Sequence, residues 1–218
     1  MPNNDEPCVP ALGISHIVCG RENVGGRVHY FLDANCRLQE KAIPEQVVLW
    51  RWRRRKSPHG FSFGGDRLSP NVWRAMALAF PDGRGISADA ELEDLRLAVD
   101  ASRDQLRSMD YSLPSAQCLQ AIFRGIGPGR VKDLIKRHTL PERKDCYGTP
   151  DLCLYMTSTT FIRPPVIRFV EVKKPDEELL AHQEEEIAFL ISIGIAARVL
   201  RLIERDCPST KGGNKHGT

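Results

Sequence analysis

The last third of the chain carries an order of apolar segments that few folds can accommodate. Two short apolar runs, Leu152 to Met156 and Val166 to Val172, precede a helical face that starts after Pro175 and stops at Gly194, and a further apolar run spans Ala196 to Ile203. The second run alternates as a strand does, and proline is tolerated in the first turn of a helix. Because a strand, helix, strand crossover normally joins parallel neighbours, this region predicts a buried α/β sheet.

The chain before this region has mostly helical spacings, so we expect a mainly helical first half. Segments rich in Gly, Ser or Pro predict connections at Ser57 to Pro70 and Thr157 to Pro165, and a tight turn at Gly125 to Gly129. Apolar residues at helical spacing predict helices within Val28 to Cys36, Gln46 to Trp52, Glu91 to Met109, Ser115 to Phe123 and Gly129 to Thr139.

Length and cysteine usage restrict the class of protein. A chain of 218 residues can bury one sizeable core, and its seven cysteines include no CxxC pair. Reduced thiols, the lack of a secretory signal and the lack of a long apolar run predict an intracellular protein with no membrane contact, in the cytoplasm or nucleoid of a bacterium or the nucleus of a eukaryote. We expect tails at 1–13 and 207–218 around one domain, 14–206, with a helical part at 14–140 and an α/β part at 141–206.

Charge is clustered although the net charge is only +3. Acidic residues gather in Asp89 to Asp94 and Asp176 to Glu186, whereas basic residues gather beside Trp50 and Trp52 and again before His138. Clustered basic residues favour contact with nucleic-acid phosphates, and solvated helices with buried tryptophans are the alternative. The candidate phosphate contacts are Arg51, Arg53, Arg54, Arg55, Lys56, Arg130, Lys132, Lys136 and Arg137.

Two acids and a lysine stand at the ends of the predicted strands. Asp151 starts the first strand, whereas Glu171 and Lys173 end the second. Side chains alternate along a strand, so Glu171 and Lys173 share one face and the Val172 carbonyl lies nearby; a hairpin would bring Asp151 alongside. A turn at Asp151 and an exposed salt bridge between Glu171 and Lys173 are the plainer alternatives.

This set of groups suits one kind of chemistry. Carboxylates that converge with a carbonyl make an oxygen-rich site for a hard divalent cation, Mg²⁺ or Mn²⁺. Such an ion polarises a phosphoryl oxygen and lowers the pKa of an attacking water. Lys173 could orient or deprotonate that water or stabilise charge on the phosphate. The pattern therefore predicts hydrolysis of phosphodiesters.

The motifs around these residues resemble those of the VRR-Nuc nucleases of the PD-(D/E)XK superfamily, and in particular the branch with the Fanconi-associated nuclease. Gly148, Pro150, Asp151 and Leu152 match its G-x-PD-L motif, Val170 to Lys173 match V-E-V-K before Pro175, and Gln183 lies on the following helix. The resemblance implies a restriction-endonuclease-like fold, an α/β mixed sheet flanked by helices.

The resemblance also implies roles for particular residues. The metal ligands would be Glu22, Asp151, Glu171 and the Val172 carbonyl, with Lys173 catalytic and Gln183 supporting it in the catalytic set. Glu22 follows from its place before an expected helix, and Glu45 or Glu91 could take that role instead. One departure is Glu186, where the family often has an aromatic residue.

The implied activity is cleavage of branched or 5′-flap DNA during DNA repair, as a 5′ flap endonuclease or 5′–3′ exonuclease. The implied partners are branched, flapped or single-strand-containing DNA and a protein that supplies substrate specificity. A standalone Holliday-junction resolvase or restriction-like nuclease, and a non-catalytic DNA-binding module, remain alternatives.

Overall fold

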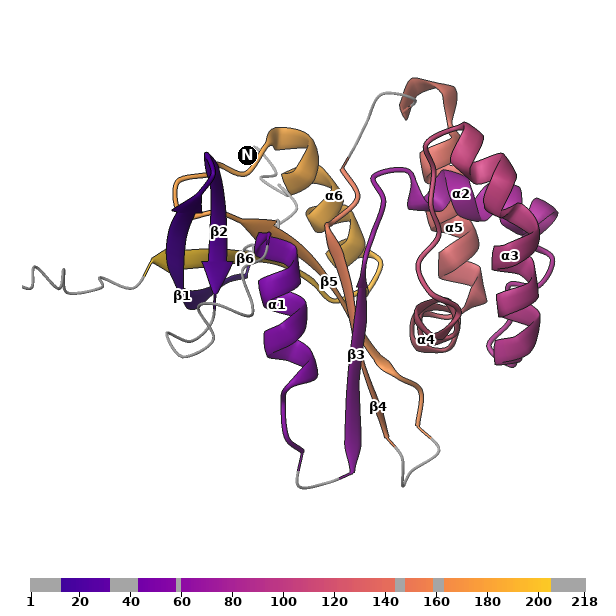
Figure 1. The fold of residues 1–218 in the computed structure, drawn as a ribbon. Helices are drawn as coiled ribbons and strands as arrows, with labels where there is room; N and C mark the ends of the chain where they lie inside the picture. Colours follow the sequence, from indigo (N-terminus) through magenta and orange to yellow (C-terminus); the bar gives the residue numbers. More distant parts are fainter. Residues whose placement is uncertain (1–12, 32–42, 58–59, 144–147, 159–162, 205–218) are drawn as a thin grey trace, which may run out of the picture.

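The fold of this computed structural model is built on one mixed sheet, and the structure describes residues 13–31, 43–57, 60–143, 148–158 and 163–204 (Figure 1). The strand order is β2-β1-β6-β5-β4-β3. Strands β1 and β5 each pair in parallel with β6, and the other pairs are antiparallel. The strands are β1 (Ile14–Val24), β2 (Arg27–Phe31), β3 (Phe61–Arg67), β4 (Leu152–Ser158), β5 (Val166–Lys173) and β6 (Ala197–Glu204).

Helices cover both faces of the sheet and enclose two apolar cores. On one face, α1 (Pro44–Arg53) packs Val47, Val48 and Leu49 against a core that includes Val170 and Val172 of β5. The other face carries α6 and a helical group, which share a second core with Ile167 and Phe169 of β5. The elements on that side are α2 (Val72–Ala79), η2 (Pro81–Gly83), α3 (Leu92–Ser108), α4 (Ala116–Ile126), α5 (Pro128–Thr139), η3 (Pro141–Arg143) and α6 (Ala181–Ser192).

The expected order of the last third is confirmed. Strands β4 and β5 form the antiparallel hairpin, and β5, α6 and β6 form the crossover with parallel strands. The four helices expected at Gln46 to Trp52, Glu91 to Met109 and on either side of the glycine turn are α1, α3, α4 and α5. Among the described residues, no helix is long and apolar enough to cross a membrane.

The helix expected from Val28 to Cys36 is wrong where the structure describes it. Residues Arg27–Phe31 form β2, which pairs with β1 through Asn23 and Val28, and residues 32–36 lie outside the described part. Gly25 and Gly26 make the turn with φ of 59° and 78°. Two glycines at positive φ are typical of a tight hairpin, so the turn chemistry overrode the apolar spacing.

The connection expected at Ser57 to Pro70 is also wrong, because Phe61–Arg67 is the edge strand β3, paired with β4. Glycine is typical of loops, but here it leaves room for a neighbouring side chain, because a Cβ on Gly64 would lie 2.3 Å from the Tyr155 ring. At the expected connection Thr157 to Pro165, β4 continues to Ser158, and 159–162 lie outside the described residues. Strands from both sides of residue 140 join in one sheet.

Candidate active site

The ends of β4 and β5 bring together the acids expected from the sequence. Asp151 immediately precedes β4, and its Oδ2 accepts a hydrogen bond of 2.8 Å from the backbone N–H of Val172. On β5, the Lys173 Nζ lies 3.1 Å from Glu171 Oε1. Glu171 is 2% exposed and Lys173 1%, so this is not the exposed salt bridge that was the plainer alternative.

Gln183, in the first turn of α6, holds the lysine and the glutamate. Its Oε1 accepts from Lys173 Nζ at 2.7 Å and from the Leu180 backbone N–H at 3.1 Å, and its Nε2 donates to Glu171 Oε1. Because the Leu180 N–H demands an acceptor, the amide must point its oxygen toward Lys173 and its NH₂ toward Glu171. A cap of the helix N-terminus thereby orients two groups of the site.

Glu177 is a neighbour of Lys173 that the sequence reasoning missed. Its Oε1 lies 3.3 Å from Lys173 Nζ, and its side chain is 42% exposed. The spacing of four residues from Lys173 within an acidic stretch was the available signal, but four-residue spacing implies contact only inside a helix, and this segment lies outside one.

Carboxylate charge is concentrated at this site. Burial, reinforced by the charge of Asp151, raises the pKa of Glu171 to about 7 although Lys173 acts in the opposite direction. The pKa of Asp151 is also raised, first by burial and then by the charge of Glu45, against the lowering effect of the Val172 N–H. A divalent cation beside these groups would relieve their repulsion.

Glu45 is the upstream acid that the structure places toward Asp151. It lies in the first turn of α1, its charge raises the pKa of Asp151, and its buried Oε2 has no hydrogen-bond partner in the part of the chain that the structure describes. A buried carboxylate oxygen without a donor is costly unless a cation approaches it. Glu45 is therefore the upstream acid whose charge acts on Asp151.

The expected context of Glu22 is wrong. Glu22 is a residue of β1 paired with His29 of β2, so it precedes a hairpin turn and not a helix. The β1–β6 pairing ends at Cys19 and Glu204, so Glu22 lies beyond the end of β6 in the hairpin. Glu91, the third acid considered, is the N-cap residue of α3 in the helical group.

The donor set fits a hard cation that keeps much of its own water. Among the described residues, no group of three or more His, Cys, Asp or Glu side chains is placed so that it could hold a metal ion. Mg²⁺ is usually bound through one or two carboxylates and substrate phosphates, with several waters retained. Two carboxylates of this kind, Asp151 and Glu171, lie at the ends of β4 and β5.

The close surroundings of Gly148 explain why the G-x-PD-L motif begins with glycine. A Cβ at this position would lie 2.8 Å from the His182 carbonyl oxygen and 3.0 Å from the Glu186 Cβ. The chain leading to Asp151 therefore passes directly against the first turns of α6, which carries Gln183. Glycine at position 148 therefore allows the segment before Asp151 to lie close to the helix that carries Gln183.

The pH dependence of stability should report the buried carboxylate of Glu171. With its pKa raised to about 7, Glu171 of the folded protein retains a proton up to about that pH, whereas the pKa of an unperturbed glutamate is 4.5. Raising the pH through this window therefore favours unfolding, because the unfolded chain releases that proton first. In the presence of a chelator, the free energy of unfolding of the wild type should fall as the pH rises from 4.5 to 7. This fall should exceed that of Glu171→Gln by on the order of 2 kcal/mol.

Denaturant unfolding at several pH values measures this difference. Magnesium should reduce the fall in the wild type, because a metal competes with the proton for the same oxygens. Equal pH slopes in the wild type and in Glu171→Gln would show that Glu171 does not titrate in this window.

Some of the basic residues expected to contact phosphate are bound within the fold, and others are exposed. Arg53 donates to the Gly65 carbonyl and pairs with Asp66 at 3.6 Å, so it ties α1 to β3. Arg51, Arg54, Arg55 and Lys56 are exposed on or just after α1, and Arg130, Lys132 and Lys136 are exposed on α5.

Arg137 is held within the fold by α6. It pairs with Glu185 at 3.0 Å and Glu186 at 3.2 Å, and its guanidinium stacks 3.8 Å from the Phe189 ring. Glu186 also lies 2.7 Å from His138, and although burial alone would raise its pKa, His138 and Arg137 lower it. Glu186, which stands where the family often has an aromatic residue, therefore forms a buried ion pair that joins α5 to α6.

Comparison with known proteins identifies the family of this chain. The family model described as the VRR-NUC domain matches residues 87–202, more than half of the chain. The chain belongs to the VRR-NUC family of nuclease domains. The match to the VRR-NUC model contains Asp151, Glu171, Lys173 and Gln183, whereas α1 with Glu45 precedes it. No curated protein matches this VRR-NUC chain.

Solved structures support the restriction-endonuclease-like fold of this VRR-NUC chain. Crystal structures of paFAN1 bound to DNA with a 2-nucleotide or 1-nucleotide 5′ flap and a gap match with TM-scores of 0.54 and 0.55, both at 14% identity. The matches cover 94% of this chain and 40% of the paFAN1 chains, so this chain spans less than half the length of those relatives.

Proposed function

We propose that this VRR-NUC domain is a divalent-metal-dependent nuclease that hydrolyses DNA at branches or 5′ flaps. The single observation that carries the proposal is the buried Lys173–Glu171 pair beside Asp151, at the ends of two adjacent strands. Asp151, Glu171 and the Val172 carbonyl would hold Mg²⁺ or Mn²⁺, with Glu45 in place of Glu22 as the further carboxylate. Lys173 would be the catalytic ammonium, and Gln183 would be the residue that orients it.

A bound divalent ion supplies Lewis-acid polarisation of the phosphate and a more acidic water. The protein groups contribute position and charge. Lys173 places its ammonium at a fixed point beside the carboxylates, where it stabilises negative charge developing on the phosphate or orients the attacking water. Gln183 prevents the lysine from turning away, because Nζ is bound at 2.7 Å to an amide that the helix cap itself holds.

The choice of substrate rests on the relatives. The paFAN1 structures carry 5′-flap DNA, and this chain shares their fold. We propose flapped or branched DNA as the substrate on this likeness, with a role in DNA repair. We also propose that a protein partner contributes to the substrate specificity of this domain.

The test compares DNA structures and metals under one set of conditions. Purified protein should cleave a labelled 5′ flap faster than plain duplex in Mg²⁺ or Mn²⁺, and excess EDTA should abolish cleavage. Mapping the products on both labelled ends separates endonucleolytic from exonucleolytic cutting. A four-way junction cut in preference to the flap would favour a resolvase, and binding without cleavage in every metal would favour a non-catalytic module.

A further inference from the structure

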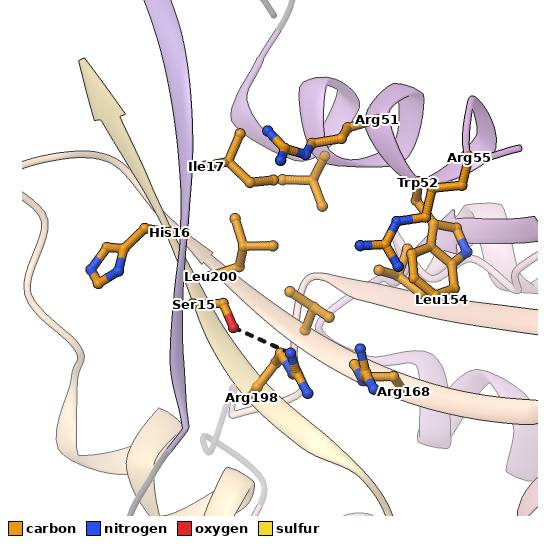
Figure 2. Close-up of a pocket in the computed structure, with 12 residues that line it drawn as sticks. Ser15, His16, Ile17, Arg51, Trp52, Arg55, Leu154, Arg168, Arg198 and Leu200 are labelled. Atoms are coloured by element: carbon orange, nitrogen blue, oxygen red, sulfur yellow. Dashed lines mark hydrogen bonds between the residues drawn. The ribbon is translucent and has the colours of Figure 1, made fainter. Parts of the chain in front are cut away.

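A pocket on the α1 face of the sheet is rimmed by arginines from three elements. Its volume is about 140 Å³, and aliphatic side chains including Leu154 and Leu200 line it. The arginines are Arg51 in the last turn of α1, Arg55 just after it, Arg168 on β5 and Arg198 on β6. Figure 2 shows Arg55, Arg168 and Arg198 around one space. No aspartate or glutamate lines this pocket, so its lining has a strong positive charge.

The guanidinium groups of this pocket have no acidic partner in the part of the chain that the structure describes. Within the described ranges, none of the four forms an ion pair with a carboxylate, and the buried Nε of Arg168 has no hydrogen-bond partner. Arg198 donates to Ser15 Oγ at 3.2 Å, and Arg55 lies 4.8 Å from the centroid of the Trp52 ring. Burial, then the charges of Arg198 and Arg55, lowers the pKa of Arg168.

The pocket is held in shape by contacts outside its rim. Trp52 Nε1 lies 2.9 Å from the Gly64 carbonyl oxygen and 3.1 Å from that of Tyr155, so it anchors the end of α1 to β3 and β4. Arg168 and Arg198 project from neighbouring strands whose register pairs Val170 with Arg198. The arginines are therefore placed by the sheet and by an anchored helix before any ligand arrives.

We propose that this pocket binds one phosphate group. Guanidinium groups offer planar, paired donors that match phosphate oxygens, and a volume well under the roughly 300 Å³ of drug-sized sites suits a small anion. The carbonyl end of α1 carries partial negative charge that opposes an anion, but it amounts to about half an elementary charge against four guanidinium groups. The phosphate would come from a DNA strand or from a free ion or nucleotide.

The pocket is separate from the proposed metal centre. Arg168 precedes Glu171 by three residues, about 10 Å along a strand, and strand alternation directs the two side chains to opposite faces. Along α1, Arg51 follows Glu45 by six residues, a rise of about 9 Å. A DNA phosphate held here would thus fix the strand at a second point; this DNA source rests on the proposed nuclease function, whereas phosphate binding itself does not.

Binding measured in EDTA tests the pocket without cleavage. The probes are inorganic phosphate, followed by calorimetry, and a flapped DNA with a 5′-phosphate or a 5′-hydroxyl, followed by fluorescence anisotropy over a range of salt. The variants are Arg168→Gln with Arg198→Gln, and separately the exposed pair Arg51→Gln with Arg55→Gln. The control is Arg96→Gln with Arg103→Gln on α3, which removes the same charge from exposed ion pairs.

Both pocket variants should weaken DNA binding roughly 10-fold, and the slope of log K against log salt should fall by about 0.9, the value for one lost phosphate contact. The control should leave both values unchanged. Loss restricted to the 5′-phosphorylated DNA would identify a terminal phosphate, and loss of inorganic phosphate binding alone would identify a free ion; both support the pocket.

If both pocket variants bind phosphate and DNA as tightly as the wild type does, the proposal is overturned. If the double variant in the sheet does not fold, the exposed pair Arg51 and Arg55 decides, because both residues lie at the surface. Phosphate binding in a protein that cuts no DNA in any metal would refute the nuclease and support the pocket, so the two failures are distinguishable.

Discussion

Asp151→Asn and Lys173→Met are each expected to slow cleavage of flapped DNA by at least ~10³-fold, a loss of about 4 kcal/mol of transition-state stabilisation. Asparagine keeps the shape of Asp151 and can still accept the Val172 N–H, so the change removes mainly charge from the proposed metal ligand. Methionine keeps the apolar stem of Lys173, which is 1% exposed, and removes the ammonium. Single-turnover cleavage in saturating Mg²⁺ measures the chemical step.

Glu177→Gln is the matched control for these variants. Glu177 also contacts Lys173, at 3.3 Å, but its side chain is 42% exposed, and we expect a loss of less than about 10-fold. Circular dichroism and thermal unfolding establish that each variant folds. Wild-type cleavage rates in a folded Asp151→Asn protein would remove the assignment of the active centre.

Glu45→Gln is expected to reduce cleavage by about 10²-fold at a fixed low Mg²⁺ concentration, whereas Glu22→Gln should remain within about 2-fold of the wild type. The reason is placement: the charge of Glu45 reaches Asp151 and its buried Oε2 has no partner among the described residues, whereas Glu22 belongs to the β1–β2 hairpin. The measurement is the rate as a function of Mg²⁺, where loss of a ligand raises the concentration needed for half-maximal cleavage.

The stability of the metal-free protein is a second readout for Glu45. Removing its charge relieves repulsion with Asp151, so Glu45→Gln should not lower the unfolding temperature in EDTA. A large loss of activity in Glu22→Gln with normal activity in Glu45→Gln would reverse the assignment of the upstream ligand.

The sequence by itself determined the hairpin, the crossover and the central motif. Strand alternation and helical apolar spacing depend on neighbours in the chain, so the pattern from Leu152 to Ile203 was sufficient to predict β4, β5, α6 and β6. The expected start of the helix after Pro175 is wrong, because α6 begins at Ala181. The same alternation put Glu171 and Lys173 on one face, and the structure places them 3.1 Å apart.

Only the tertiary structure decided which distant segments meet. β2 and β3 carry signals of helix and loop, and both became strands because pairing partners were available, with Gly64 providing room for a ring from β4. Glu45 and the arginine pocket likewise depend on where α1 crosses the sheet. Long-range packing sets these contacts, and no local period in a single sequence encodes the position of one element against another.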